Sequence, residues 1–281
     1  MDIPVGIVTY NPDIVRLREN INAVYNAAAV VIIADNGSVN SKEIQTLISE
    51  YDRIVFLSND VNKGIAAALN QLCEEAVNRK YSYILTLDQD SVCPDNLFAE
   101  FSKYTGRQDA GIICPAIRDR NHNLDVINNR EETEEINRCI TSGSLVMLKV
   151  WKEIGGFDES MFIDGVDFDF CNRMRARGYI VLRVNKVVLL HEIGNIEIRH
   201  FLFFKVRVKN HSSFRKYYIA RNTVYQARKQ KKAALIFKAH LQVIKQYFMV
   251  LLYEDDKKKK LHEIVRGFKD GKKAAIDERW I

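Results

Sequence analysis

The chain has 281 residues, of which 47% are hydrophobic and 28% are charged, so it holds enough apolar side chains for one large core, or for one core and a smaller appendage. Five cysteines are scattered along it with no paired spacing, which argues against a disulfide framework and a thiolate zinc site. The first strand-like run begins at Val5, which leaves no room for a secretion signal, so we expect a cytoplasmic protein.

The net charge of +6 is unevenly distributed along the chain. Residues 1–198 contain 20 Lys and Arg against 29 Asp and Glu, whereas residues 199–281 contain 22 against 7. A basic tail of this kind indicates an anionic partner, either phospholipid headgroups or nucleic acid, or an ordinary solvated basic face. The longest apolar run near the C-terminus, from Val243 to Tyr253, is interrupted by Lys245 and Gln246, and we expect it to be too short to cross a bilayer.

Short apolar runs alternate with helix-like stretches in the first half of the chain. The expected strands are 4–10, 30–35, 53–58, 82–87 and 110–116, and the expected helices between them are about 13–27, 41–50, 64–79 and 95–104. This alternation is typical of βαβ units around a largely parallel sheet. Ligands of such sheets bind beyond the carboxyl ends of the strands, so the polar residues that end these strands are the first candidates for a site.

The second half of the chain is less regular and becomes helical and basic towards its end. Short strand-like pieces continue to about 148, and helices are expected near 149–155 and 167–177. Within 233–253, five apolar side chains follow helical spacing, namely Phe237, Leu241, Ile244, Phe248 and Leu251. We expect an amphipathic helix there. The run from Asp255 to Lys260 should separate it from a last amphipathic segment near 261–273.

Two aspartates close the apolar strand at 82–87, in the triplet Asp88-Gln89-Asp90. Paired carboxylates at the mouth of a sheet repel each other, and Mg²⁺ or Mn²⁺ relieves that repulsion while it binds diphosphate oxygens. Aspartate pairs are also common in turns, so the triplet alone is a weak signal. Its position at a strand end favours a metal site that neutralises a nucleotide leaving group.

Two other strand ends carry residues suited to a nucleotide. Asp35, which precedes Asn36-Gly37-Ser38, is placed either to accept the base N–H of a pyrimidine or simply to form a turn. Gly64, after Asn62 and Lys63, starts a helix of small residues, where unpaired backbone N–H groups favour phosphate or ribose oxygens. No dinucleotide-binding or P-loop glycine pattern occurs. An NAD-binding protein and a P-loop nucleotide-binding protein therefore lose their main support as interpretations.

A second acidic group lies in the segment 155–171, where Asp164, Asp167 and Asp169 alternate with bulky apolar residues. At least one of them should lie in a pocket, where partial burial beside other carboxylates raises the carboxyl pKa and makes a general base usable near neutral pH. Helix capping by Asp164 or Asp167 is the simpler interpretation. His191, which ends another apolar run, is either structural or completes a metal site with Asp90.

The order of these motifs resembles glycosyltransferase family 2 over most of residues 3–230. The motifs that carry the resemblance are Thr9-Tyr10-Asn11, Asp35-Asn36-Gly37-Ser38, Asn62-Lys63-Gly64-Ile65-Ala66, Asp88-Gln89-Asp90, Thr141-Ser142-Gly143-Ser144, Gly156-Phe157-Asp158-Glu159, Phe162-Ile163-Asp164-Gly165-Val166-Asp167 and His191-Glu192-Ile193-Gly194. Within that family, the Phe162-Ile163-Asp164 opening and the later Tyr217-Tyr218-Ile219-Ala220-Arg221-Asn222 look like bacterial rhamnosyltransferases that use dTDP-L-rhamnose.

The resemblance implies an α/β fold of the GT-A type, which is a Rossmann-like, mostly parallel sheet flanked by helices, with a helical extension at the C-terminus. It implies a catalytic domain over residues 1–205, with a nucleotide-binding half at 1–117 and an acceptor-side half at 118–205, followed by a basic amphipathic extension at 206–281. It also implies an inverting displacement at the anomeric carbon of a nucleotide sugar, assisted by Mg²⁺ or Mn²⁺.

Residue roles follow from the same resemblance. Asp167 would be the base that deprotonates the acceptor hydroxyl, and Asp88, Asp90 and His191 would hold the metal or the diphosphate. The residues implied on the donor side are Thr9, Tyr10, Asn11, Asp35, Asn36, Asn62, Lys63, Gly64, Asp88, Gln89 and Arg221. Those implied on the acceptor side are Ser142, Gly143, Asp164 and Asp169.

The chain departs from the family pattern at two positions. Lys63 stands where relatives often have a nonpolar residue, and Val166 stands where many relatives have an acidic residue directly before the base. The assignment of Asp167 is therefore firmer than that of its neighbours.

The expected reaction is transfer of L-rhamnose to a saccharide on a lipid carrier, for a cell-surface polysaccharide. The basic tail agrees with peripheral contact at the inner face of the cell membrane; packing on the catalytic domain or on a second copy of the chain is the other interpretation. Another nucleotide sugar such as a UDP-sugar, a sugar nucleotidyltransferase and a catalytically inactive sugar-binding relative are the alternatives. A nucleic-acid partner leaves both acidic groups unexplained, and we expect none.

Overall fold

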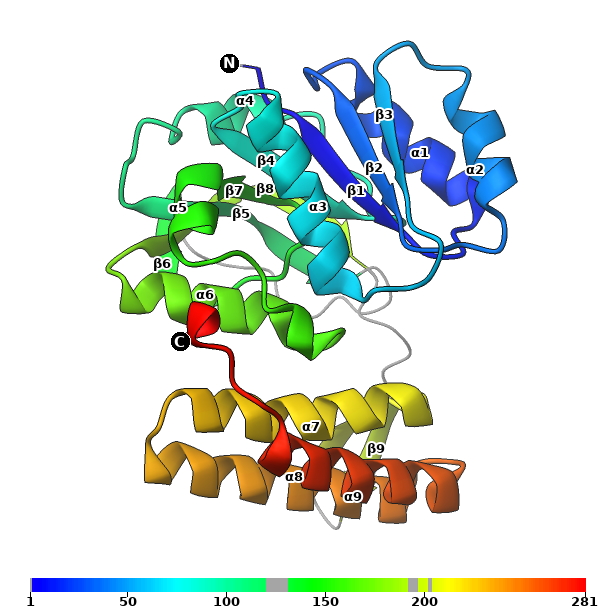
Figure 1. The fold of residues 1–281 in the computed structure, drawn as a ribbon, viewed down its shortest axis with the longest axis vertical. Coiled ribbons are helices and arrows are strands. Elements are labelled where there is room, and N and C mark those ends of the chain that lie inside the picture. The colour runs from blue at the N-terminus through cyan, green and yellow to red at the C-terminus, as the bar shows by residue number, and fades with distance from the viewer. Residues whose placement is uncertain (1, 120–130, 192–196, 202–203) are drawn as a thin grey trace. The chain divides into compact units, whose positions relative to one another are not determined.

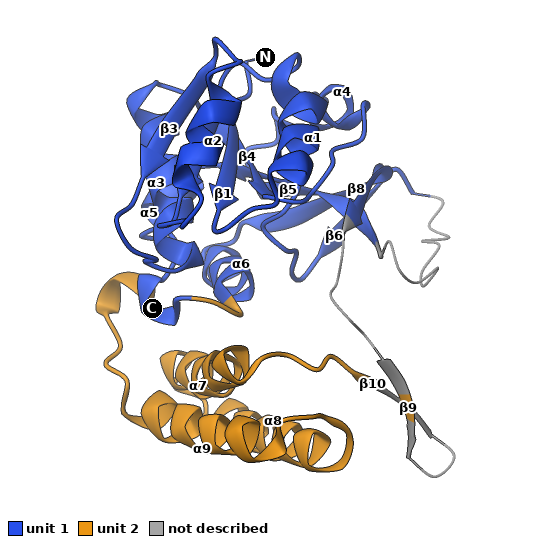
Figure 2. Ribbon diagram, turned by 90° about the vertical axis from the view of Figure 1, so that its right-hand side faces the viewer, with its two compact units in different colours: residues 1–162, 166–192 blue, residues 163–165, 193–281 orange. Residues whose placement is uncertain are grey.

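The computed structural model describes residues 2–119, 131–191, 197–201 and 204–281 (Figure 1). The chain divides into two compact units, coloured separately in Figure 2. The first unit comprises Met1–Phe162 and Val166–Glu192, and the second comprises Ile163–Gly165 and Ile193–Ile281. The polar strand ends and the acidic segment around Asp167 belong to the first unit, whereas the basic tail belongs to the second.

The first unit is built around an eight-stranded sheet with the order β3-β2-β1-β4-β7-β5-β8-β6. Its strands are β1 (Val5–Thr9), β2 (Val31–Asp35), β3 (Ile54–Ser58), β4 (Tyr83–Asp88), β5 (Ala110–Asp119), β6 (Thr133–Ile136), β7 (Ser144–Met147) and β8 (Ile180–His191). Strands β1 to β4 are mutually parallel, and β5 is parallel to β8. Strand β7 runs antiparallel between β4 and β5, and β6 runs antiparallel to β8. The expected α/β architecture is confirmed.

Helices cover both faces of the parallel part of the sheet. Helices α1 (Ile14–Tyr25) and α2 (Ser41–Ile48) lie on one face, and α3 (Ile65–Asn78) and α5 (Leu148–Glu153) lie on the other (Figure 1). The strand order reverses direction after β3, so right-handed crossovers must place α3 opposite α1 and α2. Because both faces are covered, β1 and β2 are buried along their whole length, which explains their continuous apolar sequences. Helices α4 (Leu97–Ser102) and α6 (Val166–Ala176) complete the unit.

The register of the parallel strands aligns their polar ends. Thr9 of β1 pairs with Asp35 of β2, and Asp35 pairs in turn with Ser58 of β3. On the other side of β1, Val8 pairs with Asp88 of β4. The ends of four strands therefore meet at one edge of the sheet, as expected for the binding edge of such a fold.

The described residues of the second unit form a hairpin, three α-helices and a short 3-10 helix at Glu278–Trp280. The hairpin consists of β9 (Glu197–Phe201) and β10 (Phe204–Val208), and the helices are α7 (Ser213–Lys229), α8 (Ala233–Tyr253) and α9 (Lys257–Lys273). Two glycines of α9 let it approach the backbone of α7: a Cβ on Gly267 would come within 2.2 Å of the Tyr217 carbonyl oxygen, and one on Gly271 within 2.4 Å of that of Arg221. Only glycine fits at these contacts.

Two expected boundaries differ from the structure. The boundary expected after residue 117 falls inside β5, and the one expected after residue 205 falls inside β10. The second unit instead begins at Ile193 and includes the loop Ile163–Gly165. The amphipathic pattern of the tail marks only the helices, whereas the hairpin before them is too short to give a pattern of its own.

The acidic and basic run 255–260 was expected to separate two helices, but α9 already begins at Lys257. The reason is a buried ion cluster at the start of α9. The Lys216 ammonium lies 2.5 Å from one oxygen of Glu254, and the Lys260 ammonium lies 3.1 Å from the other. All three side chains are almost fully buried, so Lys260 is a structural residue and not a solvated spacer.

Helix α8 is longer than the apolar run that the sequence suggested. The helix has 21 residues, and an 18-residue window of it has a mean hydropathy of 1.3, which matches a membrane-crossing helix by length and composition only. Our expectation that this region is too short to cross a bilayer was based on Val243–Tyr253 alone and does not hold for the complete helix.

Candidate active site

Asp35 lies at the centre of a buried hydrogen-bond cluster at the ends of β1 and β2. One carboxylate oxygen accepts hydrogen bonds from the Thr9 hydroxyl at 3.0 Å and from the Ser38 hydroxyl at 2.5 Å, and the other accepts one from the Ser38 backbone N–H at 3.2 Å. The residue is 0% exposed. The contact with a nucleotide base that we expected of Asp35 is therefore not available in this structure, in which Asp35 fixes the strand ends.

Tyr10 and Asn11 connect the end of β1 to two neighbouring loops. The Asn11 backbone N–H donates to the Ser38 hydroxyl, and its side-chain oxygen accepts from the Val39 N–H, both at 2.8 Å. The Tyr10 backbone N–H donates to the side-chain oxygen of Gln89 at 2.8 Å, which ties β1 to the turn after β4. The Tyr10 side chain itself is exposed, so it remains available to a ligand at this edge.

Asn36 and Asn62 close the loop before α3. The Asn36 side chain donates to the Asn62 side-chain oxygen at 3.0 Å and to the Gly64 carbonyl at 3.1 Å, and it accepts from the Lys63 N–H at 2.9 Å. Asn62 in turn accepts from the Gly64 N–H at 2.9 Å. The backbone N–H groups of Lys63 and Gly64 are thus bonded within the loop, and Asn36 is a bracing residue. The Lys63 side chain is exposed.

Gly64 brings the start of α3 against the backbone of Phe162. Its φ is +87°, and a Cβ at this position would lie 2.6 Å from the Phe162 carbonyl oxygen. That oxygen accepts a hydrogen bond from the Ile65 N–H at 2.7 Å. The first free amide of the helix is therefore satisfied by protein, and the lack of a side chain at Gly64 permits this close packing. Its expected contact with the donor stays a prediction.

The turn after β4, which carries Asp88 and Asp90, is supported from behind by three polar side chains. The Asp88 backbone N–H donates to the Ser142 hydroxyl at 3.2 Å, and that hydroxyl lies 2.6 Å from the hydroxyl of Ser91. The Asn20 amide of α1 donates to the Asp88 carbonyl at 2.6 Å. Ser142 and Ser91 are buried, whereas Asp88 and Asp90 are partly exposed. The backbone of the turn is thus held firmly by buried polar groups.

Ser142 and Gly143 were expected on the acceptor side, which stays a prediction; the structure shows their contacts with β4 and with the turn that follows it. The Gly143 N–H donates to the Thr86 carbonyl of β4 at 2.8 Å, and Ser142 supports Asp88. Both residues therefore brace the turn that carries the two aspartates.

His191 is the last residue of β8, and its side chain lies outside the described part of the structure. Its backbone position is nevertheless informative. An antiparallel bridge joins Val92 to Leu190, so the chain just after Asp90 runs beside the end of β8. The bridge brings the backbone at the end of β8 next to the chain that follows the aspartate turn, and the expected role of His191 as a metal ligand stays a prediction.

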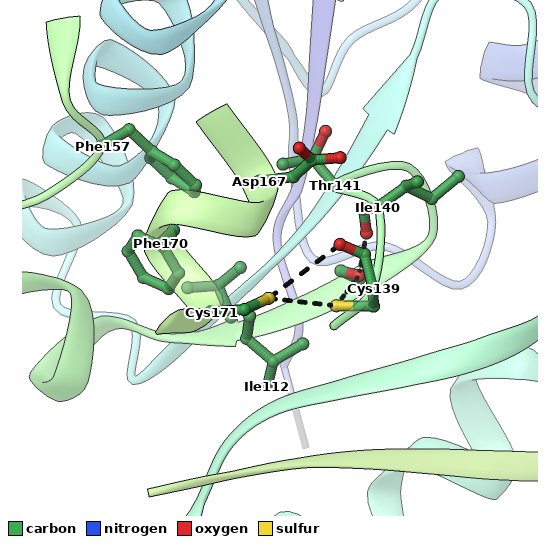
Figure 3. A pocket seen from close by; sticks show the side chains of 10 residues that line it. Ile112, Cys139, Ile140, Thr141, Phe157, Asp167, Phe170 and Cys171 are labelled. Carbon is green, nitrogen blue, oxygen red and sulfur yellow. Dashed lines mark hydrogen bonds between the residues drawn. The ribbon is translucent and has the colours of Figure 1, made fainter. Parts of the chain in front are cut away.

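Asp167 lies in the first turn of α6, and it lines a cavity together with residues of the segment 141–144. Its carboxylate accepts a hydrogen bond from the Phe168 N–H at 2.8 Å. Together with Thr141, Ser144 and Cys139 it lines a small cavity of about 10 Å³ (Figure 3), roughly the room that one water molecule needs. The Thr141 carbonyl accepts a hydrogen bond at 2.6 Å from the hydroxyl of Thr86, two residues before Asp88.

Asp88 and Asp167, which are 79 positions apart in the sequence, therefore adjoin the same turn at 141–144. The backbone N–H of Asp88 donates to the Ser142 hydroxyl, and Asp167 lines the same small cavity as Thr141 and Ser144. Among the described residues, no three His, Cys, Asp or Glu side chains are grouped closely enough to hold a metal ion by themselves. A pair of carboxylates completed by substrate phosphates is, however, the usual setting for Mg²⁺.

Asp169 has a different partner from the one expected. It is buried and forms an ion pair at 2.7 Å with Arg173, one turn further along α6. Arg173 also donates to the carbonyls of Ile154 at 2.7 Å and Gly156 at 2.8 Å. Asp169 therefore fastens α6 to the loop after α5 and does not support an acceptor.

Asp164 and Arg221 belong to the second unit. Asp164 has a φ of +66° and forms an ion pair with Arg215 of α7. The Asn222 amide holds the same loop through the carbonyls of Ile163 at 2.7 Å and Asp164 at 2.9 Å. Arg221 donates to the Asn222 side chain at 2.7 Å. Within this unit, both residues help to hold the loop that precedes Asp167 in the chain.

The cysteines are all free thiols, as expected. Burial raises the pKa of the Cys93 thiol to about 12. Cys139 and Cys171 lie beside the Asp167 cavity with their sulfurs 3.9 Å apart (Figure 3). Contact with Cys114 and burial keep the pKa of Cys139 well above its usual value. These thiols therefore stay protonated near neutral pH and are poor nucleophiles.

Two important residues were not singled out from the sequence. Asn20 occupies the buried face of α1 among Leu17, Ile21 and Val24. Asn70 occupies the buried face of α3 and uses its whole amide: it donates to the Phe157 carbonyl and to Glu159, and it accepts from the Trp151 ring N–H and the Phe157 N–H. An asparagine on the apolar side of an amphipathic helix is the signal that could have revealed both.

Comparisons with known proteins agree with this arrangement. The model of the family described as Glycosyl transferase family 2 matches residues 5–177. The dTDP-rhamnosyl transferase RfbF of Shigella flexneri is 26% identical over 238 residues, which cover 79% of this chain and 79% of that protein.

Solved structures support the fold. TarS 1–349 of S. aureus in complex with UDP-GlcNAc has a TM-score of 0.61 at 12% identity, over 96% of this chain and 80% of that one. GalNAc-T7 with UDP, GalNAc and Mn²⁺ has a TM-score of 0.58 at 13% identity, over 79% of this chain and 50% of that one. At these identities the likeness extends to the fold alone.

Proposed function

Because the chain belongs to glycosyl transferase family 2, we propose that its donor is dTDP-L-rhamnose and that it transfers L-rhamnose, with inversion, to a saccharide acceptor. The observation that carries the proposal is the convergence of Asp88 and Asp167 on the turn 141–144. A transferase needs a site for the charged leaving group beside a base for the acceptor, and these two carboxylates supply both.

The rhamnosyl donor is supported by similarity to RfbF, a dTDP-rhamnosyl transferase that aligns with 79% of this chain. The alignment extends beyond the 173 positions from 5 to 177 that the family model matches. The sequence similarity to RfbF thus covers more of the chain than the region matched by the family model. Because the Asp35 carboxylate is enclosed by Thr9 and Ser38, exposed Tyr10 is the better candidate for contact with the donor at this edge.

In the proposed mechanism, Asp167 removes the proton of the acceptor hydroxyl while that oxygen attacks the anomeric carbon of the sugar. The new bond forms between the acceptor oxygen and the anomeric carbon, and the bond from that carbon to the diphosphate oxygen breaks. The nucleoside diphosphate leaves from the opposite face, so the configuration at the anomeric carbon inverts. Asp167 is well placed for this role because it lies at the open start of α6, in a partly exposed position.

Asp88 and Asp90 would hold a divalent cation, with His191 as the third protein ligand. Two carboxylates on a firmly supported turn suit the oxygen preference of Mg²⁺ or Mn²⁺. When bound, the cation supplies positive charge against the diphosphate leaving group. Ser142, Ser91 and Asn20 keep the backbone of the turn fixed, so the carboxylates need little rearrangement to accept it.

We further propose that the acceptor is a lipid-linked saccharide of a cell-surface polysaccharide and that the enzyme acts at the cytoplasmic face of the membrane. The support is the charge distribution: residues 199–281 carry 22 Lys and Arg against 7 Asp and Glu. An excess of positive charge of this size attracts anionic lipid surfaces.

A donor panel tests the proposal. The full-length protein is incubated with dTDP-L-rhamnose, dTDP-glucose, UDP-GlcNAc and UDP-galactose, each with Mg²⁺, Mn²⁺ or EDTA, and release of nucleoside diphosphate and thermal shift are measured. We expect dTDP-L-rhamnose to give the largest release and the largest shift, and EDTA to abolish release.

Other outcomes of the panel would contradict particular parts of the proposal. Preference for a UDP-sugar would overturn the rhamnosyl assignment, and full activity in EDTA would overturn the metal assignment. Formation of a nucleotide sugar from a nucleoside triphosphate and a sugar phosphate would instead identify a nucleotidyltransferase.

A further inference from the structure

Helix α8 carries a continuous row of exposed apolar side chains along one face. The row, here called the α8 stripe, consists of Phe237, Leu241, Ile244, Phe248, Leu251 and Leu252. These side chains are between 42% and 65% exposed. Their spacing of three, four and seven residues places them on one side of the helix. An exposed row of two aromatic and four aliphatic side chains indicates a binding surface.

The stripe is not the face that holds the second unit together. Ala239, Val243 and Val250 are the buried residues of α8, and Val243 and Val250 pack in a core with Val224 of α7 and Ile264 of α9. At 100° per residue these buried positions lie on the side of the helix opposite the α8 stripe. Helix α8 therefore has two apolar faces, and only one of them is used within the unit.

Basic side chains border the stripe. Lys238 and Lys245 are exposed and, by their helical positions, lie along one margin of it. Lys257, Lys258 and Lys259 are exposed at the start of α9, separated from the end of α8 by three residues and next to the exposed Asp255 and Asp256. Apolar side chains flanked by lysines on one surface form the pattern of a helix that lies in the headgroup region of an anionic membrane.

The geometry points to an anionic phospholipid bilayer as the partner of the α8 stripe, with α8 lying parallel to the membrane surface. The two aromatic and four aliphatic side chains enter the acyl region, and the lysines at the margin reach the phosphate groups. A second copy of the chain would bring the same positive charge to the interface, whereas anionic headgroups neutralise it. Charge complementarity therefore favours the bilayer over a dimer.

The structure also argues against insertion of α8 across the membrane, although its length and mean hydropathy permit it. A spanning orientation would surround the helix with lipid and remove Val243 and Val250 from the core of the second unit. It would also place Lys238 and Lys245, which lie within the helix, inside the hydrocarbon region. Contact parallel to the membrane leaves the core of the second unit intact and keeps Lys238 and Lys245 at the headgroups.

Vesicle binding by the full-length protein tests this inference. Sedimentation is compared for vesicles of phosphatidylcholine alone and of phosphatidylcholine mixed with phosphatidylglycerol. We expect binding to the mixed vesicles only, and a loss of at least about tenfold in affinity for the variant Phe237→Gln/Ile244→Gln/Phe248→Gln. The charge variant Lys238→Gln/Lys245→Gln should lose about fivefold in affinity for each lysine, and its binding should depend less steeply on salt concentration.

The matched control is Val15→Gln/Val39→Gln, which removes two exposed apolar side chains from the first unit and should bind like the original chain. Release of nucleoside diphosphate from a soluble donor should be unchanged in the stripe variant, so failure of membrane binding and failure of the proposed function are distinguishable. Far-ultraviolet circular dichroism checks that the stripe variant is folded.

Orientation is tested with Phe248→Trp and brominated lipids. Quenching of the new tryptophan by bromine near the headgroups supports parallel contact, whereas stronger quenching by bromine near the bilayer centre would show that α8 spans the membrane and overturn the inference. Unchanged vesicle binding by the stripe variant, or a dimer in light scattering that this variant abolishes, would overturn it as well.

Discussion

The Ser142 hydroxyl accepts the backbone N–H of Asp88 at 3.2 Å across 54 positions of sequence. The same hydroxyl lies 2.6 Å from that of Ser91. One buried serine therefore connects the turn at 141–144 to the turn that carries the two aspartates. It fixes the position of the Asp88 backbone, from which the carboxylate side chain extends.

Ser142→Ala should weaken the site without unfolding the protein. The substitution leaves the Asp88 N–H and the Ser91 hydroxyl without this partner, at a cost of about 1–3 kcal/mol. We expect a several-fold higher concentration of Mg²⁺ or Mn²⁺ for half-maximal activity, measured by titration of the cation at saturating donor. Ser49→Ala, which removes an exposed hydroxyl bonded only to the Thr46 carbonyl, is the control and should titrate like the original chain.

Asp167→Asn should abolish turnover and preserve donor binding. A general base contributes about 10²- to 10⁴-fold to the rate, and an amide cannot accept the proton. The expected result is a fall of this size in kcat with little change in the thermal shift caused by the donor. Asp52→Asn, which changes an exposed carboxylate, should leave kcat unchanged. A normal kcat in Asp167→Asn would remove the base assignment.

Asp35→Asn separates a structural role from a role in base recognition. The Asp35 carboxylate only accepts hydrogen bonds, from Thr9 and Ser38, and an amide would place a donor against one of them. We expect a loss of about 1–3 kcal/mol in the free energy of unfolding, measured with urea. A raised KM for the donor at unchanged stability would show instead that Asp35 acts through the nucleotide.

Asp169→Asn should be among the most destabilising single substitutions in the first unit. It leaves the Arg173 guanidinium buried without its carboxylate, and breaking a buried ion pair from one side costs about 3–5 kcal/mol. The free energy of unfolding in urea measures the effect. Asp109→Asn breaks an exposed ion pair with Arg107 and should have little effect. Equal effects of the two substitutions would contradict the structural role of Asp169.

His211 should make the second unit less stable in mild acid. Burial, and then the nearby Arg215, lower the pKa of His211 from 6.5 to about 4. Between these values the unfolded chain binds a proton that the folded chain does not, so stability falls as the pH drops from about 6.5 towards 4. His211→Gln should reduce that slope in urea unfolding at a series of pH values, whereas His262→Gln, at an exposed position, should retain it.

Much of the fold could be predicted because the strands are buried on both faces. Their unbroken apolar runs end in polar residues, and the helices between them have clear periodicity, so β1 to β4 and α1 to α3 were located to within two residues at each end. The hairpin β9–β10 and the early start of α9 could not be predicted. The first is too short for a pattern, and the second depends on Lys216, a residue 44 positions away from Lys260.

The site was predicted less completely than the fold, for a physical reason. The sequence identified polar residues at the strand ends, but it does not distinguish a side chain that faces a ligand from one that satisfies its neighbour. Asn36 and Gly64 proved to be bracing residues, and Asp169 proved to be the partner of Arg173. Which of two asparagines pairs with the other depends on loop geometry, which no local pattern encodes.

The antiparallel insertion of β7 between β4 and β5 limits how this enzyme can move. Strand β4, which ends at Asp88, and strand β5 are both hydrogen-bonded to β7, which follows the 141–144 turn. No hinge can therefore open between these strands without breaking the sheet. Within the first unit, closure around substrates would then involve the loops at the sheet edge. New acceptor preferences are accordingly easier to gain by exchanging those loops than by rearranging rigid lobes.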